Sequence, residues 1–509
     1  MTRFLSTCLA ALFIGGPSLA EAGRWQRTKL QVPGTILWSG AGDLDADGWR
    51  DLVVSYRRNA GPASRKFIGV FFGSEGGFPP RPTTAFAAPK IAAAFDIGDV
   101  AGDPAEELVY LSRDGVWAQS LKKRRAARPT RVLAVPTLAA GGEQEDLVSW
   151  DFVRAPTAGE PLTMIVPGRN GLLLYRRAGP RWTRWSTINT GYDSFYDAER
   201  STYRRSRRGG NTGRNYAFSV TTVVPNLTFA DQTGDGRVDL ITNLHDRVMV
   251  FSARPDGTLT STPTFQRWFK IRTRQELVSR DTDLDVQFAD LDHDGVADLS
   301  VTKIGGGLTN MKTETRLYRG RKGGGFSRRP DQTFRDDGFA SLVRYMDVDG
   351  DGRLEMVHPR ASVSIIGLTR VLLSSELKLD FRIREGDRSG GGLFATKPAD
   401  TFTSALGLDF TVGGALRGAY PVLGSDLDGD RRPDVAVTQG KERLAVHTGL
   451  PPGPTQRIFS EDPRYSITID ATRHTRLIHL GRGAPPALLM LYVGRPALQG
   501  QMVLLSYKD

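Results

Sequence analysis

Short apolar runs recur along the chain between polar and glycine-rich turns. The clearest runs follow acidic segments, and they are Leu52-Val53-Val54, Leu240-Ile241, Leu299-Ser300-Val301, Met356-Val357 and Val435-Ala436-Val437. Runs of this length between turn residues predict strands rather than helices. A second apolar stretch, a Gly-rich turn and a more polar segment follow, as in Ile68 to Gly73 and then Glu75-Gly76-Gly77-Phe78. With one strand before each acidic segment, the pattern predicts units of four strands, the number in a propeller blade.

The acidic segments share the phrase Asp-x-Asp-x-Asp-Gly-x-x-Asp. Copies begin at Asp43, Asp231, Asp290, Asp347 and Asp426, with a weaker copy at Asp99. The steps 43 to 99, 231 to 290 and 290 to 347 are 56, 59 and 57 residues, a period that predicts a propeller or a solenoid. The longer steps, 99 to 231 and 347 to 426, indicate insertions and one eroded unit near Asp151 to Ile165.

Counting these units predicts an all-β propeller of about eight four-stranded blades. The predicted blade starts are near Thr35, Ile91, Leu147, Val223, Asp285, Ala340, Ala419 and His474. Seven blades are the alternative, if the region 147–175 does not form one. The last unit ends before its outer strand, and we expect Arg27 to Val32 to supply that strand, because closure removes exposed sheet edges.

The domain prediction is a signal peptide over residues 1–22 and one propeller over residues 23–509. Length alone suggests two or three domains, but a closed ring of repeats overrides that expectation. The segment after Met1 has an apolar core and small residues up to Ala22, which is typical of a secretory signal and too short to span a bilayer. The single cysteine, Cys8, lies inside it, so we expect no disulfide in a secreted or periplasmic mature protein.

Two stretches do not follow the repeat, and we interpret both as loop insertions on a propeller face. One is Gly191 to Tyr216, where six arginines alternate with tyrosine and phenylalanine. The other is Arg382 to Ala419, which is glycine-rich and weakly patterned.

The acidic phrase has the chemistry of a calcium loop. Calcium takes six to eight hard oxygen ligands, which carboxylates at alternating positions of a tight turn supply, and glycine at the sixth position permits the bend. The predicted metal ligands, with the seventh residue contributing its carbonyl, are Asp43, Asp45, Asp47, Trp49 and Asp51; Asp231, Thr233, Asp235 and Asp239; Asp290, Asp292, Asp294, Val296 and Asp298; Asp347, Asp349, Asp351, Arg353 and Glu355; and Asp426, Asp428, Asp430 and Asp434.

An EF-hand does not fit these loops, because it requires Glu at the twelfth position and flanking helices. Val54 and Val301 stand at that position, and strands are predicted on both sides. The loops and their flanking strands instead resemble FG-GAP/VCBS repeats, the family that includes the integrin alpha-subunit propeller. That resemblance covers most of the mature chain and implies calcium bound between the first two strands of a blade.

Some copies depart from the phrase. The Asp231 copy has Thr233 at the third position, and the Asp99 copy has Ala101 there, so we expect metal at Asp231 and not at Asp99. The Asp426 copy has Arg431 where glycine is expected, which predicts strain in the turn.

The net positive charge of the chain indicates which class of partner to expect. The net charge is +12, and removing residues 1–22 deletes one Arg and one Glu and leaves it unchanged. A basic surface favours anionic partners. We expect an acidic polysaccharide, lipopolysaccharide or a surface protein, and we disfavour nucleic acid.

Two classes of function remain. The first is a secreted, calcium-binding propeller that acts as a binding or adhesion module for an anionic or glycan ligand. The second is an extracytoplasmic carbohydrate-active enzyme such as a polysaccharide lyase. The chain carries no nucleophile elbow, zinc-binding His-Glu-x-x-His or phosphate-binding glycine loop, and we assign no catalytic residue.

Overall fold

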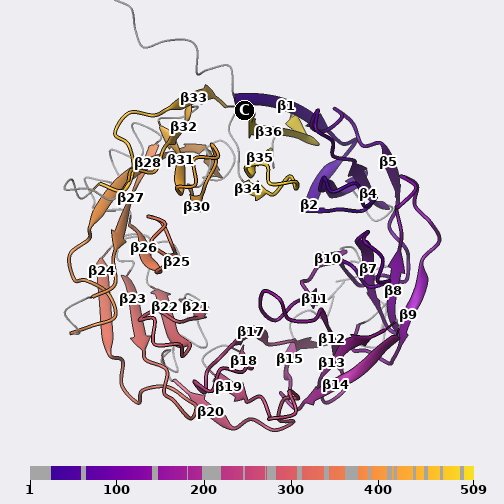
Figure 1. Cartoon of the computed structure of the whole chain (residues 1–509), viewed down its shortest axis with the longest axis horizontal. Coiled ribbons are helices and arrows are strands. Elements are labelled where there is room, and N and C mark those ends of the chain that lie inside the picture. The colour runs from indigo at the N-terminus through magenta and orange to yellow at the C-terminus, as the bar shows by residue number, and fades with distance from the viewer. Residues whose placement is uncertain are drawn as a thin grey trace, which may run out of the picture.

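The protein is an eight-bladed β-propeller, as the repeat predicted (Figure 1). The computed structural model describes residues 25–58, 65–139, 147–179, 181–197, 219–244, 247–269, 271, 282–305, 312–337, 343–360, 376–387, 391–409, 415–417, 421–439, 443–451, 457–469, 474–492 and 498–508. Their regular elements are 36 β-strands, and no α-helix occurs among them.

Each blade is an antiparallel sheet whose strands follow one another along the chain, and blades are numbered here in chain order. Blade 1 contains β2 (Thr35–Gly42), β3 (Asp51–Arg58), β4 (Arg65–Phe71) and β5 (Thr84–Ala87). Blade 2 contains β6 (Ala94–Gly98), β7 (Glu107–Ser112), β8 (Gly115–Gln119) and β9 (Thr130–Ala134), with β10 (Val148–Ser149) added parallel to β6. Blade 3 contains β11 (Val153–Arg154), β12 (Thr163–Gly168), β13 (Gly171–Ala178) and β14 (Arg181–Ile188). Blade 4 contains β17 (Asn226–Ala230), β18 (Asp239–Leu244), β19 (Arg247–Phe251) and β20 (Phe265–Trp268).

The second half of the ring repeats this order. Blade 5 contains β21 (Thr282–Ala289), β22 (Asp298–Gly305), β23 (Lys312–Tyr318) and β24 (Gln332–Asp337). Blade 6 contains β25 (Arg344–Met346), β26 (Glu355–Arg360), β27 (Glu376–Arg384), β28 (Asp400–Asp409) and β29 (Ala415–Arg417). Blade 7 contains β30 (Val422–Ser425), β31 (Asp434–Gln439), β32 (Arg443–His447) and β33 (Tyr465–Thr468). Blade 8 contains β34 (His474–Ile478), β35 (Ala487–Leu491), β36 (Gln501–Tyr507) and β1 (Trp25–Gln31).

In each blade the first strand lies toward the centre of the ring and the fourth lies at its periphery (Figure 1). The first strands begin close to the predicted blade starts. The largest difference is in blade 3, predicted near Leu147 and found at Val153. The region that made seven blades an alternative does form a blade, because β11 to β14 pair as one sheet.

The ring closes through the N-terminal strand. Strand β1 pairs antiparallel with β36, from Trp25 opposite Tyr507 to Gln31 opposite Gln501, and so becomes the outer strand of blade 8. Trp25 also stacks on Tyr465 of blade 7, with ring centroids 5.0 Å apart. The predicted closure by residues near 27–32 is therefore confirmed.

The hydrophobic core lies between blades. Seven clusters of buried side chains each join neighbouring blades, for example Leu317 and Phe334 of blade 5 with Met356 of blade 6. The second strand of a blade is covered on both faces, and all six residues of β7 are buried. This explains why the apolar runs after the acidic segments are continuous rather than alternating.

Residues 382–419 differ from the prediction of a loop insertion. Their first residues end β27, and residues 400–409 form β28, which pairs with β27 over eight positions. The glycine run between these strands is the turn that carries Phe394, a buried side chain at the interface with blade 5. The segment is rich in glycine and threonine, so its sequence lacks the apolar pattern of a strand. Backbone pairing with β27 and contact with a neighbouring blade hold it in the sheet.

Two predictions lie largely outside the described residues. The predicted signal peptide, residues 1–22, is one of them, and the six arginines of the 191–216 insertion are the other. The described start of that insertion contains β15 (Asp193–Asp197), which pairs with β16 (Ser219–Val223), a strand just after the insertion, in a two-stranded ribbon. Within the described residues, no helix has the length and apolarity that crossing a membrane requires.

Candidate metal centres

Six blades carry an acidic loop between their first and second strands. These loops are named after their blades: loop 1 (43–51), loop 2 (99–107), loop 4 (231–239), loop 5 (290–298), loop 6 (347–355) and loop 7 (426–434). Because every first strand leads into its loop in the same direction, all six loops lie on one face of the propeller.

The first acid closes five of the six loops by accepting a backbone N–H. In loop 5, the Asp290 Oδ2 atom accepts the N–H of Gly295 at 3.0 Å. The same bond from the sixth residue recurs in loops 1, 4, 6 and 7, at 2.7–3.0 Å. Loop 2 cannot form it, because Pro104 stands at the sixth position and has no N–H.

The fifth acid makes a second local bond. Asp294 Oδ1 accepts the N–H of Val296 at 2.9 Å, and the equivalent bond occurs in loops 1, 4, 6 and 7. The seventh residue thus has its N–H turned toward the fifth carboxylate. That the carbonyls of Trp49, Val296 and Arg353 ligate a metal stays a prediction.

Two positions of the loop have left-handed backbone, of which the sequence indicated only one. At the sixth position φ is between 80° and 87° for the glycines of loops 1, 4, 5 and 6, and it is 71° for Arg431. At the fourth position φ is also positive, including 62° at Ala46 and 59° at His293. Arg431 therefore adopts the unfavourable conformation that was predicted for it.

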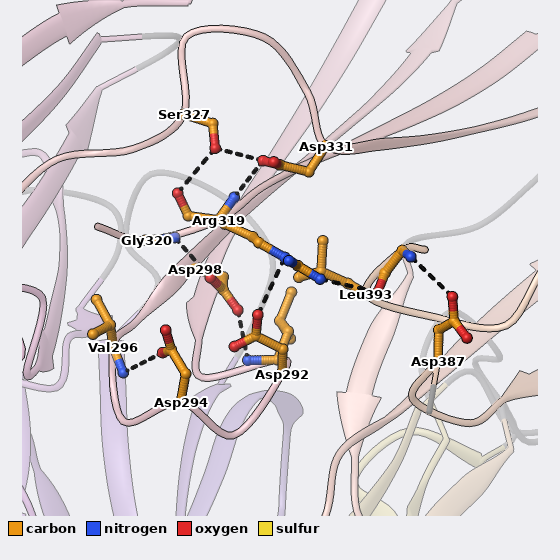
Figure 2. Close-up of polar contacts among 12 residues, drawn as sticks. Asp292, Asp294, Val296, Asp298, Arg319, Gly320, Ser327, Asp331, Asp387 and Leu393 are labelled. Carbon is orange, nitrogen blue, oxygen red and sulfur yellow. Dashed lines mark hydrogen bonds and ion pairs between the residues drawn. The ribbon is translucent and has the colours of Figure 1, made fainter. Parts of the chain in front are cut away.

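The ninth acid is a structural brace. Asp298 accepts the Leu291 N–H on Oδ2 at 2.9 Å and the Gly320 N–H on Oδ1 at 2.7 Å, so it joins the loop to the residue just beyond β23 (Figure 2). Loops 1, 4 and 7 repeat both bonds. Both oxygens of this predicted ligand are therefore already engaged with backbone.

Burial sets the protonation of these braces. It raises the pKa of Asp51, Asp298 and Asp434 to about 7 each and that of Glu355 to about 8, and it raises the pKa of Asp239. Nearby loop carboxylates add to the shift in loops 1, 5, 6 and 7. A cation in the loop would favour the charged forms.

Acidic oxygens converge in four of the loops. Three carboxylates lie within 4.8 Å of one another in each group, and the groups are Asp43, Asp45 and Asp51; Asp290, Asp292 and Asp294; Asp347, Asp349 and Asp351; and Asp426, Asp428 and Asp434. Among the described residues, loops 2 and 4 form no such group. The predicted ligands Asp47, Asp298, Glu355 and Asp430 lie outside the groups of their loops, as do all the predicted ligands of loop 4.

Arginines account for some of these differences. Arg124 pairs with Asp47 of loop 1 at 3.2 Å, Arg432 pairs with Asp430 of loop 7, and Arg237 pairs with Asp235 of loop 4. Each guanidinium directs a fifth-position carboxylate toward itself. Loops 5 and 6 have the fifth acid in their convergent groups.

Buried carboxylate oxygens without a partner indicate that loops 1 and 5 fit a cation. Buried oxygens without a hydrogen-bond partner include Oδ1 of Asp43, Asp45 and Asp292. In Asp292 the other oxygen lies 3.2 Å from Arg319 Nε (Figure 2). In Asp45 the other oxygen lies 2.6 Å from Arg124 Nε. Unpaired buried carboxylate oxygens are unfavourable, and a bound cation would satisfy them.

The arginines that orient these acids were not predicted from sequence. Arg319 follows β23 of the same blade, Arg124 belongs to the next blade, and Arg464 lies 3.4 Å from Asp428 in blade 7. Arg319 also donates to the Gly392 carbonyl of blade 6 at 3.1 Å, which couples loop 5 to the next blade. Their distances along the chain from the loops vary, so no fixed spacing marks them.

The fold and these loops define the class of protein: a β-propeller of eight blades with acidic, oxygen-rich loops at one end of the ring. No family model matches the chain, and no curated protein matches it. Solved structures with some likeness include a lectin from Agrocybe aegerita that recognises non-reducing terminal N-acetylglucosamine, at 14% identity over 94% of this chain and 99% of that one, with a TM-score of 0.40. A biofilm matrix protein of V. cholerae matches at 12% identity over 94% and 88% of the two chains, with a TM-score of 0.29.

A third likeness is to a Photorhabdus luminescens Tc holotoxin pore, at 15% identity over 90% of this chain, with a TM-score of 0.29. The chain spans 17% of the length of that protein. At these TM-scores, none of the likenesses bears on function.

Proposed function

We propose that the acidic loops are calcium sites of the FG-GAP/VCBS type. The observation that carries this proposal is the convergence of three carboxylates in loops 1, 5, 6 and 7, with unpaired buried oxygens in loops 1 and 5. The donors are all oxygens, which suits calcium better than metals that prefer nitrogen or sulfur. Asp290, Asp292 and Asp294 would hold the ion in loop 5, with Asp298 bracing the loop from beneath. Bound calcium supplies positive charge on the face of the propeller that carries the loops.

We further propose that the molecule is an extracytoplasmic binding or adhesion module for an anionic or glycan ligand. The chain has a net charge of +12 even though its acids are concentrated in the loops. Filled calcium sites would neutralise those loops and leave a strongly basic surface. Such a surface attracts acidic polysaccharide or lipopolysaccharide over long range.

The calcium proposal predicts that chelation destabilises the protein. A ligand that binds only the folded state stabilises it by mass action, by about 1.4 kcal/mol per site at roughly ten times its dissociation constant. Extracellular calcium modules bind at roughly 10⁻⁴ to 10⁻³ M, so we expect a higher melting temperature in 10 mM calcium than in excess chelator. Metal content by mass spectrometry, followed by the two melts, measures this.

Loop variants separate the sites from general salt effects. Asp292→Asn is expected to reduce the calcium-dependent rise in melting temperature. Asp462→Asn, a change at an exposed acid outside the loops, is its matched control. Equal melting temperatures of wild-type protein in calcium and in chelator would contradict the proposal that the loops bind calcium.

The binding role is tested on immobilised polysaccharide. We expect calcium-loaded protein to be retained on heparin-like or lipopolysaccharide resin and released by salt, because screening weakens charge attraction. Neutral dextran resin is the control. Retention equal on both resins would contradict an anionic ligand.

A further inference from the structure

A cluster of cationic side chains is buried between blades 5 and 6, apart from the acidic loops. It consists of His358, Arg360, Arg382 and Arg384 of blade 6 and Asp336 of blade 5, and is called here the cationic cluster. The sequence does not reveal this cluster, because its members come from three different strands, β24, β26 and β27.

Strand register brings these residues together. In blade 6, Met356, His358 and Arg360 of β26 lie opposite Arg384, Arg382 and Asp380 of β27, respectively. Alternation along a strand puts the β26 set and its partners on one face of the sheet. Met356 packs against Leu317 and Phe334 of blade 5, so this face is turned toward that blade.

Blade 5 contributes one carboxylate to the cluster. Asp336 of β24 lies 3.4 Å from His358 Nδ1, 3.4 Å from Arg382 Nη1 and 3.7 Å from Arg360 Nε. The neighbouring acid on β23, Glu314, pairs instead with Arg316 and Arg335. Two guanidinium groups and the His358 ring therefore share the Asp336 carboxylate.

Several polar atoms in the cluster have no hydrogen-bond partner. They are Nε and Nη1 of Arg384, both ring nitrogens of His358, Nε of Arg360 and Oγ1 of Thr313, which lies opposite Asp336 on β23. Arg384 is 5% exposed and His358 is 1% exposed. Arg384 packs against the Phe334 ring, with its guanidinium carbon 5.0 Å from the centroid. Leaving charged donors buried and unpaired is strongly unfavourable, so these donors require an acceptor that the protein itself does not supply.

We propose that the cationic cluster is a binding site for an oxyanion, either a carboxylate or a sulfate group. A guanidinium is a permanently charged donor of several N–H groups to oxyanions, and Nε and Nη1 of Arg384 are two such donors that have no acceptor in the protein. Thr313 supplies a neutral hydroxyl donor, and both ring nitrogens of His358 also lack a hydrogen-bond partner. The anion also balances the charge that Asp336 leaves uncompensated.

The site is reached from the surface. The side chains of Arg360 and Arg382 are each 28% exposed, whereas Arg384 is buried. Arg360 is the last residue of β26, at the end of the blade away from loop 6. An anionic group on a longer chain can therefore enter while the rest of the ligand stays outside. That the group belongs to an acidic saccharide rests on the proposed function; the oxyanion site itself does not.

The test uses the full chain and defined anions. Sodium sulfate and sodium glucuronate are titrated calorimetrically at constant ionic strength, with sodium chloride and glucose as controls. We expect wild-type protein to bind sulfate or glucuronate in one site and to bind neither control. Binding of sulfate alone assigns a sulfate ester, and binding of glucuronate alone assigns a uronate carboxylate.

Variants decide where the anion binds. Arg384→Met is expected to weaken binding at least tenfold. Arg382→Gln is expected to do the same, and it keeps the buried Arg384 in place if Arg384→Met fails to fold. Arg335→Met, at an exposed arginine on the opposite face of β24 that pairs with Glu314, is the matched control and should bind like wild type. Unchanged affinity in both cluster variants, or no anion binding above chloride, would overturn the proposal. If the protein binds sulfate but is not retained on acidic polysaccharide, the oxyanion site stands and the proposed polysaccharide ligand is rejected.

Discussion

At the scale of single residues, Arg431 carries backbone strain that glycine would remove. Its φ of 71° lies in the left-handed region, which costs a non-glycine residue about 1–2 kcal/mol. Part of the gain from glycine is offset by the greater freedom of the unfolded chain. We expect Arg431→Gly to stabilise the protein by about 0.5–1 kcal/mol in chemical unfolding.

Gly295→Arg is the reciprocal change, since Gly295 is the sixth residue of loop 5 with φ of 85°. It should destabilise by a similar amount. If Arg431→Gly is neutral or destabilising, the side chain makes a contribution that the backbone argument omits.

His358 gives the protein an acid sensitivity. Burial, opposed by Asp336 and reinforced by Arg384, Arg382 and Arg360, lowers the pKa of His358 well below its usual range. The folded state therefore binds fewer protons than the unfolded state below about pH 6.5, so stability is fully present above that pH and is lost as the pH falls. We expect wild type to lose about 1–2 kcal/mol more than His358→Gln between pH 7.5 and 5.

Urea unfolding of the two proteins at several pH values measures this difference. The buried carboxylates of the loops titrate in both proteins and cancel in the comparison. Parallel pH dependences would show that folding does not lower the pKa of His358.

The ninth acid and the fifth acid of a loop should respond differently to amide substitution. Asp298 accepts backbone N–H groups on both oxygens, and Asn would set its own N–H₂ against one of them. Asp298→Asn is therefore expected to cost about 1–3 kcal/mol in calcium and in chelator alike. Asp294→Asn keeps an oxygen for Val296 and should lose mainly the calcium-dependent part. Paired melts of both variants decide, and a loss confined to calcium in Asp298→Asn would make that acid a ligand rather than a brace.

At the scale of elements, the strands whose positions the sequence predicted best are the second strands. They are buried on both faces by neighbouring blades, so their residues are continuously apolar, and the acidic loop before each one marks its start. Strand β28 was missed because its residues Thr401 to Ser404 carry little apolar signal. Pairing with β27 and contact with blade 7 hold it in place, and neither is encoded in a local pattern.

The candidate loops show the same division. The phrase marked the acids and the sixth-position turn, but it could not show that Arg124, Arg237 and Arg432 draw fifth-position carboxylates to themselves. It also could not reveal left-handed backbone at Ala46 and His293. These features depend on the approach of side chains and on loop closure, which the linear spacing leaves open.

At the scale of the whole molecule, closure of the ring depends on β1. Leu30 is 1% exposed and packs in the cluster that joins blades 8 and 1. Leu30→Asp places a charge in that cluster and is expected to detach β1, exposing the edge of β36. We expect a markedly lower melting temperature and concentration-dependent association in size-exclusion chromatography.

Lys29→Asp is the matched control, because it puts the same side chain at an exposed position of the same strand. It should leave stability close to wild type. If both variants behave alike, β1 does not close the ring in solution.

The sequence by itself determined the repeat, a ring of seven or eight blades and the acids of the loops, because a period near 57 residues and alternating carboxylates are local properties of the chain. Only the tertiary structure decided which carboxylates converge, which arginines orient them, and that blades 5 and 6 enclose a cationic cluster. The reason is that blades meet face to face. Residues such as Asp336 and Arg384 are neighbours only because two separate sheets stack, and the charge between them follows from that stacking rather than from any spacing along the chain.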